Sequence, residues 1–386
     1  MHCCSAMGTE DAASMCWVGD DWLFKRWSLY KVVGRGSFSH VQEAVRADGK
    51  CSRKYVAKIV DKSYFRAFKT KTGSGLTPQG EARLLRKLSC PSIIKCEEWY
   101  ETEDKVYIFL EYMEGGDLLQ YILERGSLTE GQARQPFCDV AAAVSYLQER
   151  RIIHRDLKPE NILLANQKAA GLRVKLTDFG TAKVSMQVAG CTTICGTAHY
   201  AAPEMIAIFL GGRAESSGGY GGQVDLWSLG VTLYVMLSAT PPFEEDALHQ
   251  RIVRGDYAFD APEWARVSPE VKELVSCLMQ VDPSERYTAR QVAQHSWTRM
   301  CPRSGEGCDD GSEQEGQRGM MQPNGAVARS QEGDEDVREA ELKIEQGEDA
   351  NLAGFWVPKS GELSLGASQD TKARGEQEQG EGRLRS

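Results

Sequence analysis

The hydrophobic pattern changes at Gly115-Gly116, and this change restricts the fold more than any other feature of the sequence. Before the two glycines, the segments WSLYKVVGRGSFSHVQEAVRA, KYVAKIV and VYIFLEYM alternate in polarity or are rich in β-branched residues, which is typical of strands. After them, the pattern predicts longer helices over 129–150, 225–239 and 268–280. Strands followed by helices indicate an α+β protein with a small β-rich lobe, a larger helical lobe and a hinge near 111–115.

Acidic residues are concentrated at the C-terminal end of the chain. Residues 301–386 contain 19 Asp and Glu against 10 Lys and Arg, which accounts for the whole net charge of −9, while residues 1–300 hold 36 of each sign. The same segment is rich in Gly, Gln and Ser and poor in apolar residues, so it cannot bury enough surface to offset the entropy of ordering. We predict a disordered acidic tail over 299–386.

The composition also argues against several classes of protein. No concentrated basic face is visible in the sequence, so we expect no nucleic-acid partner. The uncharged stretch at 226–243 is cut short by Pro241-Pro242 and contains Ser and Thr, so we expect a buried helix and no membrane span. The twelve cysteines form no CxxC pair and follow no secretory signal, so we expect an intracellular location, in the cytoplasm or the nucleus.

A glycine-rich segment, GRGSFSHV at 34–41, raises the question of phosphate binding. Gly34 and Gly36 are placed as in a loop that covers nucleotide phosphates, but Ser39 stands where that pattern has a third glycine. Taken alone, the segment is better explained as an ordinary hairpin turn. Its function therefore depends on which residues follow downstream, and at what distance.

Two charged residues follow the glycines. Lys58 lies in VAK on a predicted strand, where a buried lysine could act as a fixed positive charge on phosphates. A strand lysine with its ammonium in solvent is the simpler interpretation while the residue is considered alone. Glu81 lies on a predicted helix at 79–88 and could pair with Lys58, since burying either charge alone would be costly.

Two further segments carry polar groups suited to phosphate chemistry. In HRDLKPEN, Pro159 predicts a loop that presents the Asp156 carboxylate, which could accept a hydroxyl proton, and the Asn161 amide oxygen. KLTDFG then places Asp178 before a Phe-Gly turn, far enough from Asn161 for a hairpin between them. Asp178 and Asn161 together supply the hard oxygen ligands that Mg²⁺ needs beside phosphate oxygens.

In combination, these motifs resemble those of a eukaryotic protein kinase. The set comprises GRGSFSHV, VAK, a helical Glu, HRDLKPEN, DFG, APE, DLWSLG and DPSERYT, in the order and at the spacings of the family. The resemblance runs from about Trp27 to about Trp297 and implies the bilobal protein-kinase fold. We therefore predict an N-terminal extension at 1–26 and a kinase domain at 27–298, with an N-lobe at 27–113 and a C-lobe at 114–298.

The resemblance also implies binding of ATP and Mg²⁺ and a role for each motif residue in phosphoryl transfer. Asp156 would orient the substrate hydroxyl and accept its proton. Asn161 and Asp178 would bind Mg²⁺, and Lys58, held by Glu81, would bind the α- and β-phosphates. The residues implied in nucleotide binding are Val33, Gly34, Gly36, Ser37, Phe38, Val41, Ala57, Lys58, Leu110, Glu111, Met113, Leu163 and Asp178, with Leu110 as the gatekeeper.

Several positions bear on the substrate. Lys158, beside the γ-phosphate, and Thr197 match residues typical of serine/threonine kinases. Asp117 and Glu160 match substrate-facing carboxylates and imply a preference for arginine three residues before the target. Ala201 is smaller than the apolar residue usual in the pocket for the residue after the target, so that preference stays open.

Other matches are structural. Glu204 and Arg286 match a buried ion pair, and Asp225 matches an anchor of the loop that carries Asp156. Cys96 falls at a core position, where cysteine behaves as a small hydrophobe.

The C-terminal motifs also suggest a branch of the family. TICGTAHYAAPE and VDPSERYTARQVAQHSW resemble the calcium/calmodulin-dependent kinase group and, within it, checkpoint kinase 2-type effector kinases of the DNA-damage response. Arg155, next to Asp156, implies activation by a phosphate on the activation loop, with Thr193 the best candidate, modified by an upstream kinase or by trans-autophosphorylation. Two alternatives stay open: a calcium/calmodulin-responsive kinase, which would need a basic helix just past residue 300, and a catalytically inactive kinase-fold scaffold.

Overall fold

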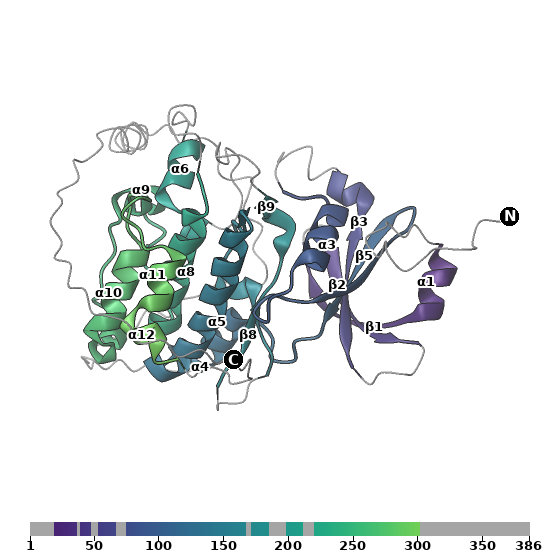
Figure 1. Cartoon of the computed structure of the whole chain (residues 1–386), viewed down its shortest axis with the longest axis horizontal. Helices are drawn as coiled ribbons and strands as arrows, with labels where there is room; N and C mark the ends of the chain where they lie inside the picture. Colours follow the sequence, from purple (N-terminus) through teal and green to yellow (C-terminus); the bar gives the residue numbers. More distant parts are fainter. Residues whose placement is uncertain are drawn as a thin grey trace, which may run out of the picture. The chain divides into compact units, whose positions relative to one another are not determined.

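The computed structural model describes residues 19–36, 39–47, 53–66, 75–166, 171–184, 198–210 and 220–301. All of them belong to one unit of the chain, residues 1–348. A strand-rich N-terminal part is followed along the chain by a helical part (Figure 1), which confirms the predicted fold class.

A five-stranded antiparallel sheet forms the N-terminal part, in the order β1-β2-β3-β5-β4. Its strands are β1 (Trp27–Arg35), β2 (Ser39–Arg46), β3 (Tyr55–Asp61), β4 (Cys96–Glu101) and β5 (Lys105–Glu111). Lys58 on the central strand β3 lies opposite Val41 on one neighbour and Ile108 on the other. The register therefore places this lysine in the middle of the sheet.

Helix α3 (Pro78–Lys87) packs against β4 and β5. Thr77 caps its N-terminus by accepting a hydrogen bond from the Gly80 N–H at 3.0 Å, and Pro78 stands in the first turn, where its missing N–H costs nothing. The prediction of a helix at 79–88 is confirmed to within one residue at each end.

A short helix that the sequence pattern does not predict, α1 (Asp20–Arg26), precedes the sheet. Its Leu23 is fully buried, as is Trp27, whose ring stacks on Phe109 with centroids 4.0 Å apart. Arg26 donates to Glu98 on β4 at 2.9 Å. The last seven residues of the predicted extension at 1–26 therefore pack on the N-terminal sheet.

The C-terminal part consists of helices and short strands. The helices are α4 (Leu118–Arg125), α5 (Glu130–Glu149), α6 (Pro203–Phe209), α8 (Gln223–Ser238), α9 (Leu248–Arg254), α10 (Pro269–Leu278), α11 (Ala289–Gln294) and α12 (Ser296–Arg299). The short strands are β6 (Ile152–Ile153), β7 (Ile162–Leu164), β8 (Val174–Leu176) and β9 (Lys183–Val184), and the 3-10 turns are η1 (Pro159–Asn161), η2 (Phe179–Thr181), η3 (Ala198–Tyr200) and η4 (Pro262–Arg266). The three long helices expected from the sequence correspond to α5, α8 and α10, within two residues at each end.

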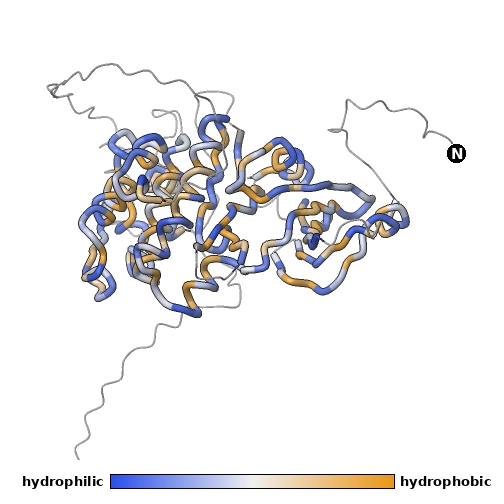
Figure 2. The backbone as a smooth tube through the Cα atoms, turned by 60° about the horizontal axis from the view of Figure 1, so that its bottom comes forward, coloured by the Kyte–Doolittle hydropathy of each residue, from blue (hydrophilic) through white to orange (hydrophobic). Residues whose placement is uncertain are grey.

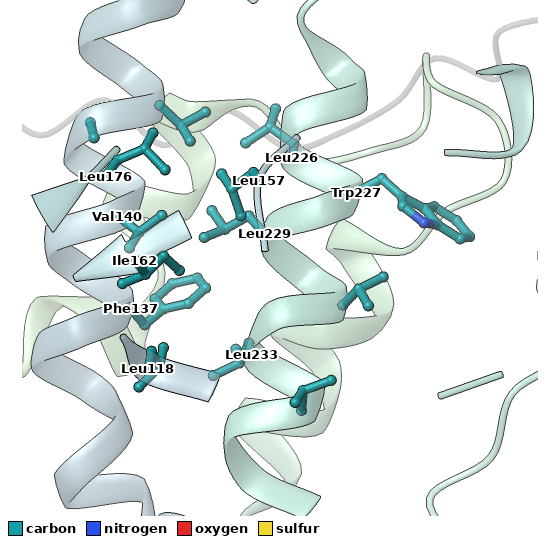
Figure 3. Close-up of a cluster of buried hydrophobic side chains, with 14 of the residues drawn as sticks. Leu118, Phe137, Val140, Leu157, Ile162, Leu176, Leu226, Trp227, Leu229 and Leu233 are labelled. Carbon is teal, nitrogen blue, oxygen red and sulfur yellow. The ribbon is translucent and has the colours of Figure 1, made fainter. Parts of the chain in front are cut away.

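Helix α8 is the centre of this part. Its residues from Val224 to Ser238 are all buried, so the helix is hydrophobic on every side because it is surrounded by protein. Figure 3 shows Val140 of α5 and Leu229 of α8 pointing into the space between the two helices, together with Leu157 from the loop between β6 and η1. The buried-helix interpretation of the uncharged stretch at 226–243 is confirmed.

Hydrophobic and hydrophilic residues are interleaved along the described chain (Figure 2). Within the described residues, no helix combines the length and the hydropathy that crossing a membrane requires.

Candidate active site

Lys58 lies between two carboxylates that come from distant parts of the chain. Its Nζ donates to Glu81 Oε1 at 2.7 Å and Oε2 at 3.0 Å, and to Asp178 Oδ1 at 3.0 Å. The side chains of Lys58 and Glu81 are only 14% and 6% exposed, whereas that of Asp178 is 47% exposed. The Lys58 ammonium is therefore held by the buried Glu81 carboxylate and also contacts the partly solvated Asp178 carboxylate.

The electrostatics of the three groups support a permanently charged lysine. Burial alone would lower the pKa of Lys58, but the attraction of Asp178 and Glu81 outweighs it and raises the pKa above its ordinary value. The Lys58 ammonium in turn lowers the pKa of Asp178 far below its usual range. Burial raises the pKa of Glu81, and Lys58 opposes that rise. Lys58 and Asp178 are therefore both ionised at neutral pH.

The loop before η1 brings the predicted base and its neighbours together. Asn161 Nδ2 donates to the backbone oxygen of Asp156 at 2.7 Å and to its Oδ2 at 2.9 Å. Lys158 Nζ lies 3.1 Å from Asp156 Oδ1. The Asp156 carboxylate is therefore oriented by an amide on one oxygen and a cation on the other.

Asp225 on α8 anchors this loop, as the sequence predicted. Its Oδ2 accepts the backbone N–H of His154 at 2.8 Å and its Oδ1 that of Arg155 at 2.9 Å. Arg155 has φ 68°, a left-handed conformation that costs energy for a non-glycine residue. The fully buried carboxylate stabilises this strained turn beside Asp156.

The predicted hairpin between Asn161 and Asp178 is present. Strands β7 and β8 pair antiparallel, with Ile162 opposite Leu176, and the Thr177 N–H donates to the Asn161 oxygen at 2.9 Å. The hairpin brings the segments of both predicted magnesium ligands side by side. Since Asn161 Nδ2 is used by Asp156, the amide oxygen is the atom left for a cation.

The chemistry of this donor pair fits Mg²⁺. Among the described residues, no group of three or more His, Cys, Asp or Glu side chains could hold a metal by itself. Two side-chain oxygens are what Mg²⁺ requires when substrate phosphates and waters complete its octahedral coordination. The donor set therefore suits a metal that arrives with a nucleotide.

Apart from Asp178, the described residues among those predicted to bind the nucleotide lie on four strands of the N-terminal sheet, just after β1 and β5, and on β7. Val33, Gly34 and Val41 are on β1 and β2, Ala57 on β3, Leu110 and Glu111 on β5, Met113 after β5, and Leu163 on β7. The N–H of Gly36 donates to the Ser39 oxygen at 2.7 Å, which closes the hairpin between β1 and β2. Strands β1 and β2 thus form a hairpin, and the predicted nucleotide-binding residues Ser37 and Phe38 lie outside the described residues.

The two predicted substrate-facing carboxylates differ in their surroundings. Asp117 Oδ1 caps α4 by accepting the Gln120 N–H at 2.8 Å. Burial raises the pKa of Glu160, and its buried Oε2 has no hydrogen-bond partner within the described residues. A buried carboxylate oxygen without a partner is costly, so Glu160 is suited to receive a cation from outside the chain.

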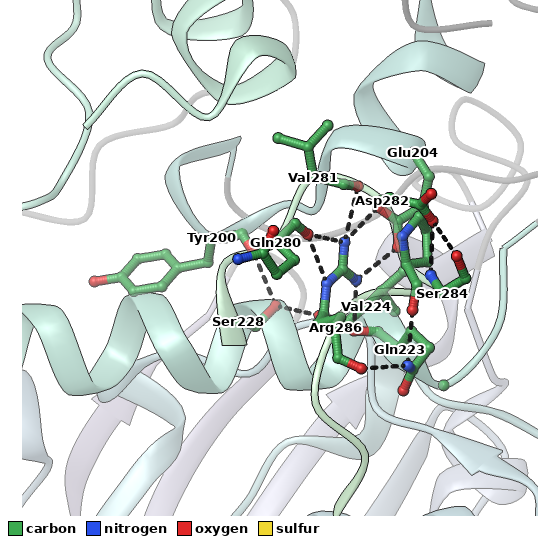
Figure 4. Close-up of polar contacts among 12 residues, drawn as sticks. Tyr200, Glu204, Gln223, Val224, Ser228, Gln280, Val281, Asp282, Ser284 and Arg286 are labelled. Atoms are coloured by element: carbon green, nitrogen blue, oxygen red, sulfur yellow. Dashed lines mark hydrogen bonds and ion pairs between the residues drawn. The ribbon is translucent and has the colours of Figure 1, made fainter. Parts of the chain in front are cut away.

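The predicted ion pair between Glu204 and Arg286 is present (Figure 4). Arg286 Nη1 and Nη2 donate to Glu204 Oε1 and Oε2 at 2.9 Å and 3.1 Å, and the Arg286 side chain is fully buried. Its remaining N–H groups reach the backbone oxygens of Gln223 and Gln280. The bidentate pair ties α6 to the start of α8 and the segment after α10.

One contact near the site was not predictable from the motifs. Leu76, just before the Thr77 cap, donates its N–H to the Gly180 oxygen at 2.8 Å, and Gly75 has φ 95°. A Cβ on Gly75 would lie 2.7 Å from that same oxygen. The only signal in the sequence was a glycine close to a helix cap. Thr193 and Thr197 lie outside the described residues.

Comparisons with known proteins agree with this geometry. The protein kinase domain family matches residues 27–298. The mouse serine/threonine-protein kinase DCLK3 is 36% identical over 281 residues, 72% of this chain and 33% of its own length. The probable serine/threonine-protein kinase fhkD of Dictyostelium discoideum is 38% identical over 71% of this chain and 37% of its own length.

A third relative is matched over more of its own length. Calcium/calmodulin-dependent protein kinase type 1 of Macrobrachium nipponense is 37% identical over 298 residues, 76% of this chain and 79% of that protein. By contrast, the chain spans 33% and 40% of the length of the mouse and human DCLK3 proteins. With the family match over 27–298 and the site geometry above, the chain belongs to the protein kinase domain family.

Proposed function

We propose that the protein is an ATP-dependent serine/threonine protein kinase that uses Mg²⁺. The observation that carries the proposal is Lys58 held 2.7 Å from Glu81 and 3.0 Å from Asp178. A scaffold without catalysis has no need of this cation between two carboxylates. All the side chains required for phosphoryl transfer are present, so the inactive-scaffold alternative is disfavoured.

Each residue has a task that follows from its surroundings. Lys58 binds the α- and β-phosphates with a charge that does not titrate near neutral pH. Asn161 and Asp178 hold Mg²⁺, which neutralises charge on the phosphate oxygens when bound. Asp156 orients the substrate hydroxyl and accepts its proton. Lys158 places a second cation beside the Asp156 carboxylate. Catalysis is then positioning and electrostatic stabilisation.

The test is phosphorylation of a serine peptide by the purified full chain with magnesium and ATP. We expect Lys58→Met and Asp178→Asn each to lower kcat/KM about a hundredfold or more. Lys62→Met is the matched control. Lys62 directly follows β3, the strand that carries Lys58, but its ammonium pairs with Glu101 and not with Glu81 or Asp178. Undiminished transfer by Asp178→Asn would overturn the proposal.

The substrate preference we propose is arginine three residues before the target. Support comes from Glu160, whose buried Oε2 has no hydrogen-bond partner within the described residues. Asp117 contributes less, because one of its oxygens caps α4.

We further propose that the kinase is activated by a phosphate on Thr193, paired with Arg155. We also propose that it acts in DNA-damage, checkpoint or stress signalling inside the cell, in the cytoplasm or the nucleus.

The checkpoint kinase 2-type assignment is supported by the C-terminal motifs alone. Calcium/calmodulin control is the alternative, favoured by the resemblance to calcium/calmodulin-dependent protein kinase type 1 and opposed by the acidic composition after residue 300. Peptide phosphorylation with and without calcium–calmodulin, for wild type and Thr193→Ala, separates the two modes of control.

A further inference from the structure

Helix α12 docks on α5 close to the end of the described chain. Trp297 is fully buried, its ring lies edge-to-face on Phe137 with centroids 5.5 Å apart, and its Nε1 donates to Glu130 Oε2 at 3.1 Å. The guanidinium of Arg134 lies 5.3 Å from the same ring. Glu130, Arg134 and Phe137 follow one another at helical spacing, so one face of α5 holds Trp297 in place.

This docking brings two cysteines to the same backbone carbonyl, that of Thr298. Cys138 follows Phe137, and its Sγ donates to the Thr298 oxygen at 3.8 Å, the same oxygen that accepts the Cys301 N–H at 3.0 Å. Cys301 Sγ in turn donates to Gln135 Oε1 at 3.2 Å. The Cys138 thiol and the Cys301 backbone N–H thus meet at one carbonyl oxygen, the Cys301 thiol contacts Gln135 one turn of α5 before Cys138, and both cysteines are partly exposed.

We propose that Cys138 and Cys301 are a modification site at which hydrogen peroxide forms a disulfide between α5 and the residues after α12. Other described cysteines lie in different surroundings. Cys277 Sγ donates to Glu273 Oε1 at 3.2 Å, and Cys96 is buried in the core, where burial raises its pKa to about 12. The inference concerns a site outside the catalytic residues and does not depend on the proposed function.

The reaction proceeds in two balanced steps. The Cys301 thiolate attacks hydrogen peroxide, and the O–O bond breaks to give the Cys301 sulfenic acid and hydroxide. The Cys138 sulfur then attacks the sulfenic sulfur, forms the S–S bond and releases water, so two electrons pass from the thiols to one peroxide. Burial, reinforced by the neighbouring Cys301, raises the pKa of the Cys138 thiol, so we assign the first step to Cys301.

The crosslink would close the long loop of chain between residues 138 and 301. Closing a loop lowers the entropy of the unfolded chain, so the oxidised protein should melt at a higher temperature, by roughly 5 °C for a domain of this size. Its kinase activity at low temperature should not change, because neither cysteine contacts the residues assigned to catalysis.

The experiment uses the reduced full chain, treated with hydrogen peroxide and then freed of it. We expect non-reducing peptide mapping to recover a Cys138–Cys301 disulfide peptide that dithiothreitol removes, together with the rise in Tm. Cys138→Ser and Cys301→Ser should each abolish both results. Cys277→Ser, a partly exposed cysteine on α10, is the matched control and should retain both.

Three outcomes would overturn the proposal. They are the absence of the Cys138–Cys301 peptide from oxidised wild type, a Cys301–Cys308 disulfide in its place, or a full rise in Tm in oxidised Cys138→Ser. Because peptide mapping is done on the wild-type chain, the answer does not depend on whether the serine variants fold.

Discussion

Leu76 donates its backbone N–H to the carbonyl oxygen of Gly180 at 2.8 Å. Gly180 follows Asp178 in the DFG segment, and Leu76 precedes the helix that carries Glu81. The start of α3 and the segment of the proposed magnesium ligand are therefore joined through backbone, in addition to the bridge that Lys58 makes between the two carboxylates.

We expect Gly75→Ala to lower kcat by about tenfold, because a Cβ there would lie 2.7 Å from the Gly180 oxygen and displace the DFG segment. Gly171→Ala is the matched control: Gly171 has φ 101°, close to the 95° of Gly75, but a Cβ there would meet nothing within 4 Å. In both variants an alanine must adopt a positive φ, so the backbone strain is similar. The variants then differ in whether the new Cβ meets the Gly180 oxygen. Steady-state kinetics and melting curves of both variants test the prediction. Equal kcat values for Gly75→Ala and Gly171→Ala would contradict it.

Glu98 joins α1 to the sheet, and this junction should respond to acid. Burial alone would raise the pKa of Glu98, but hydrogen bonds from Arg26 and Tyr100 lower it to about 2, against an ordinary value of 4.5. A carboxyl with a lowered pKa stabilises the fold above its ordinary pKa, and this stability is lost as pH falls from about 4.5 towards 2. We expect Glu98→Gln to lower the free energy of unfolding by about 1–2 kcal/mol at pH 7, after allowance for solvent screening.

Urea denaturation of wild type and Glu98→Gln at several pH values tests this. The difference between the two proteins should narrow as pH falls below about 4.5. Glu97→Gln, at the neighbouring position of β4, is the control and should lose less, since Glu97 receives only a 3.4 Å contact from Arg46 and a 3.3 Å contact from Lys95. A difference that does not change with pH would show that ionisation of Glu98 is not the cause.

Glu160→Gln should reduce the preference for arginine three residues before the target. Loss of a charged hydrogen-bond partner costs about 1.5–3 kcal/mol, roughly 10- to 100-fold in kcat/KM for the arginine peptide. The peptide with alanine at that position should be unaffected. Because burial raises the pKa of Glu160, the preference in wild type should also weaken as the pH is lowered and the carboxylate takes up a proton. Asp117→Asn serves as the comparison; a larger loss there than in Glu160→Gln would reverse the assignment.

Arg286→Met should lower the free energy of unfolding by about 3–5 kcal/mol, because it leaves Glu204 without its partner. The double variant Arg286→Met/Glu204→Gln should recover part of that loss, since no charge is then left alone. Thermal melting of the single and double variants measures the coupling. Additive losses would mean that the ion pair does not determine stability at this position.

Local patterns were enough to predict the change from strands to helices, helix α3, the long helices α5, α8 and α10, and a loop that carries Asp156 and Asn161. Helix α3 follows from its apolar spacing, and the approach of Asp156 to Asn161 follows from a short loop with Pro159. The pairing of Lys58 with Glu81 was of a different kind. Periodicity placed one residue on a strand and the other on a helix, and the cost of burying either charge alone suggested the pair. The contact itself, 2.7 Å from Lys58 Nζ to Glu81 Oε1, depends on how the helix packs against the sheet.

What the sequence by itself determined were properties set by backbone preferences and by neighbours within a few residues: caps, turns, helix faces and the motif residues themselves. Only the tertiary structure decided the packing of α1 on the sheet and the hydrogen bond from Leu76 to Gly180. It also decided that Glu160 Oε2 has no hydrogen-bond partner among the described residues and that Cys138 and Cys301 meet at the Thr298 oxygen. These features depend on segments far apart in the chain and on how the whole core packs, which no local pattern encodes.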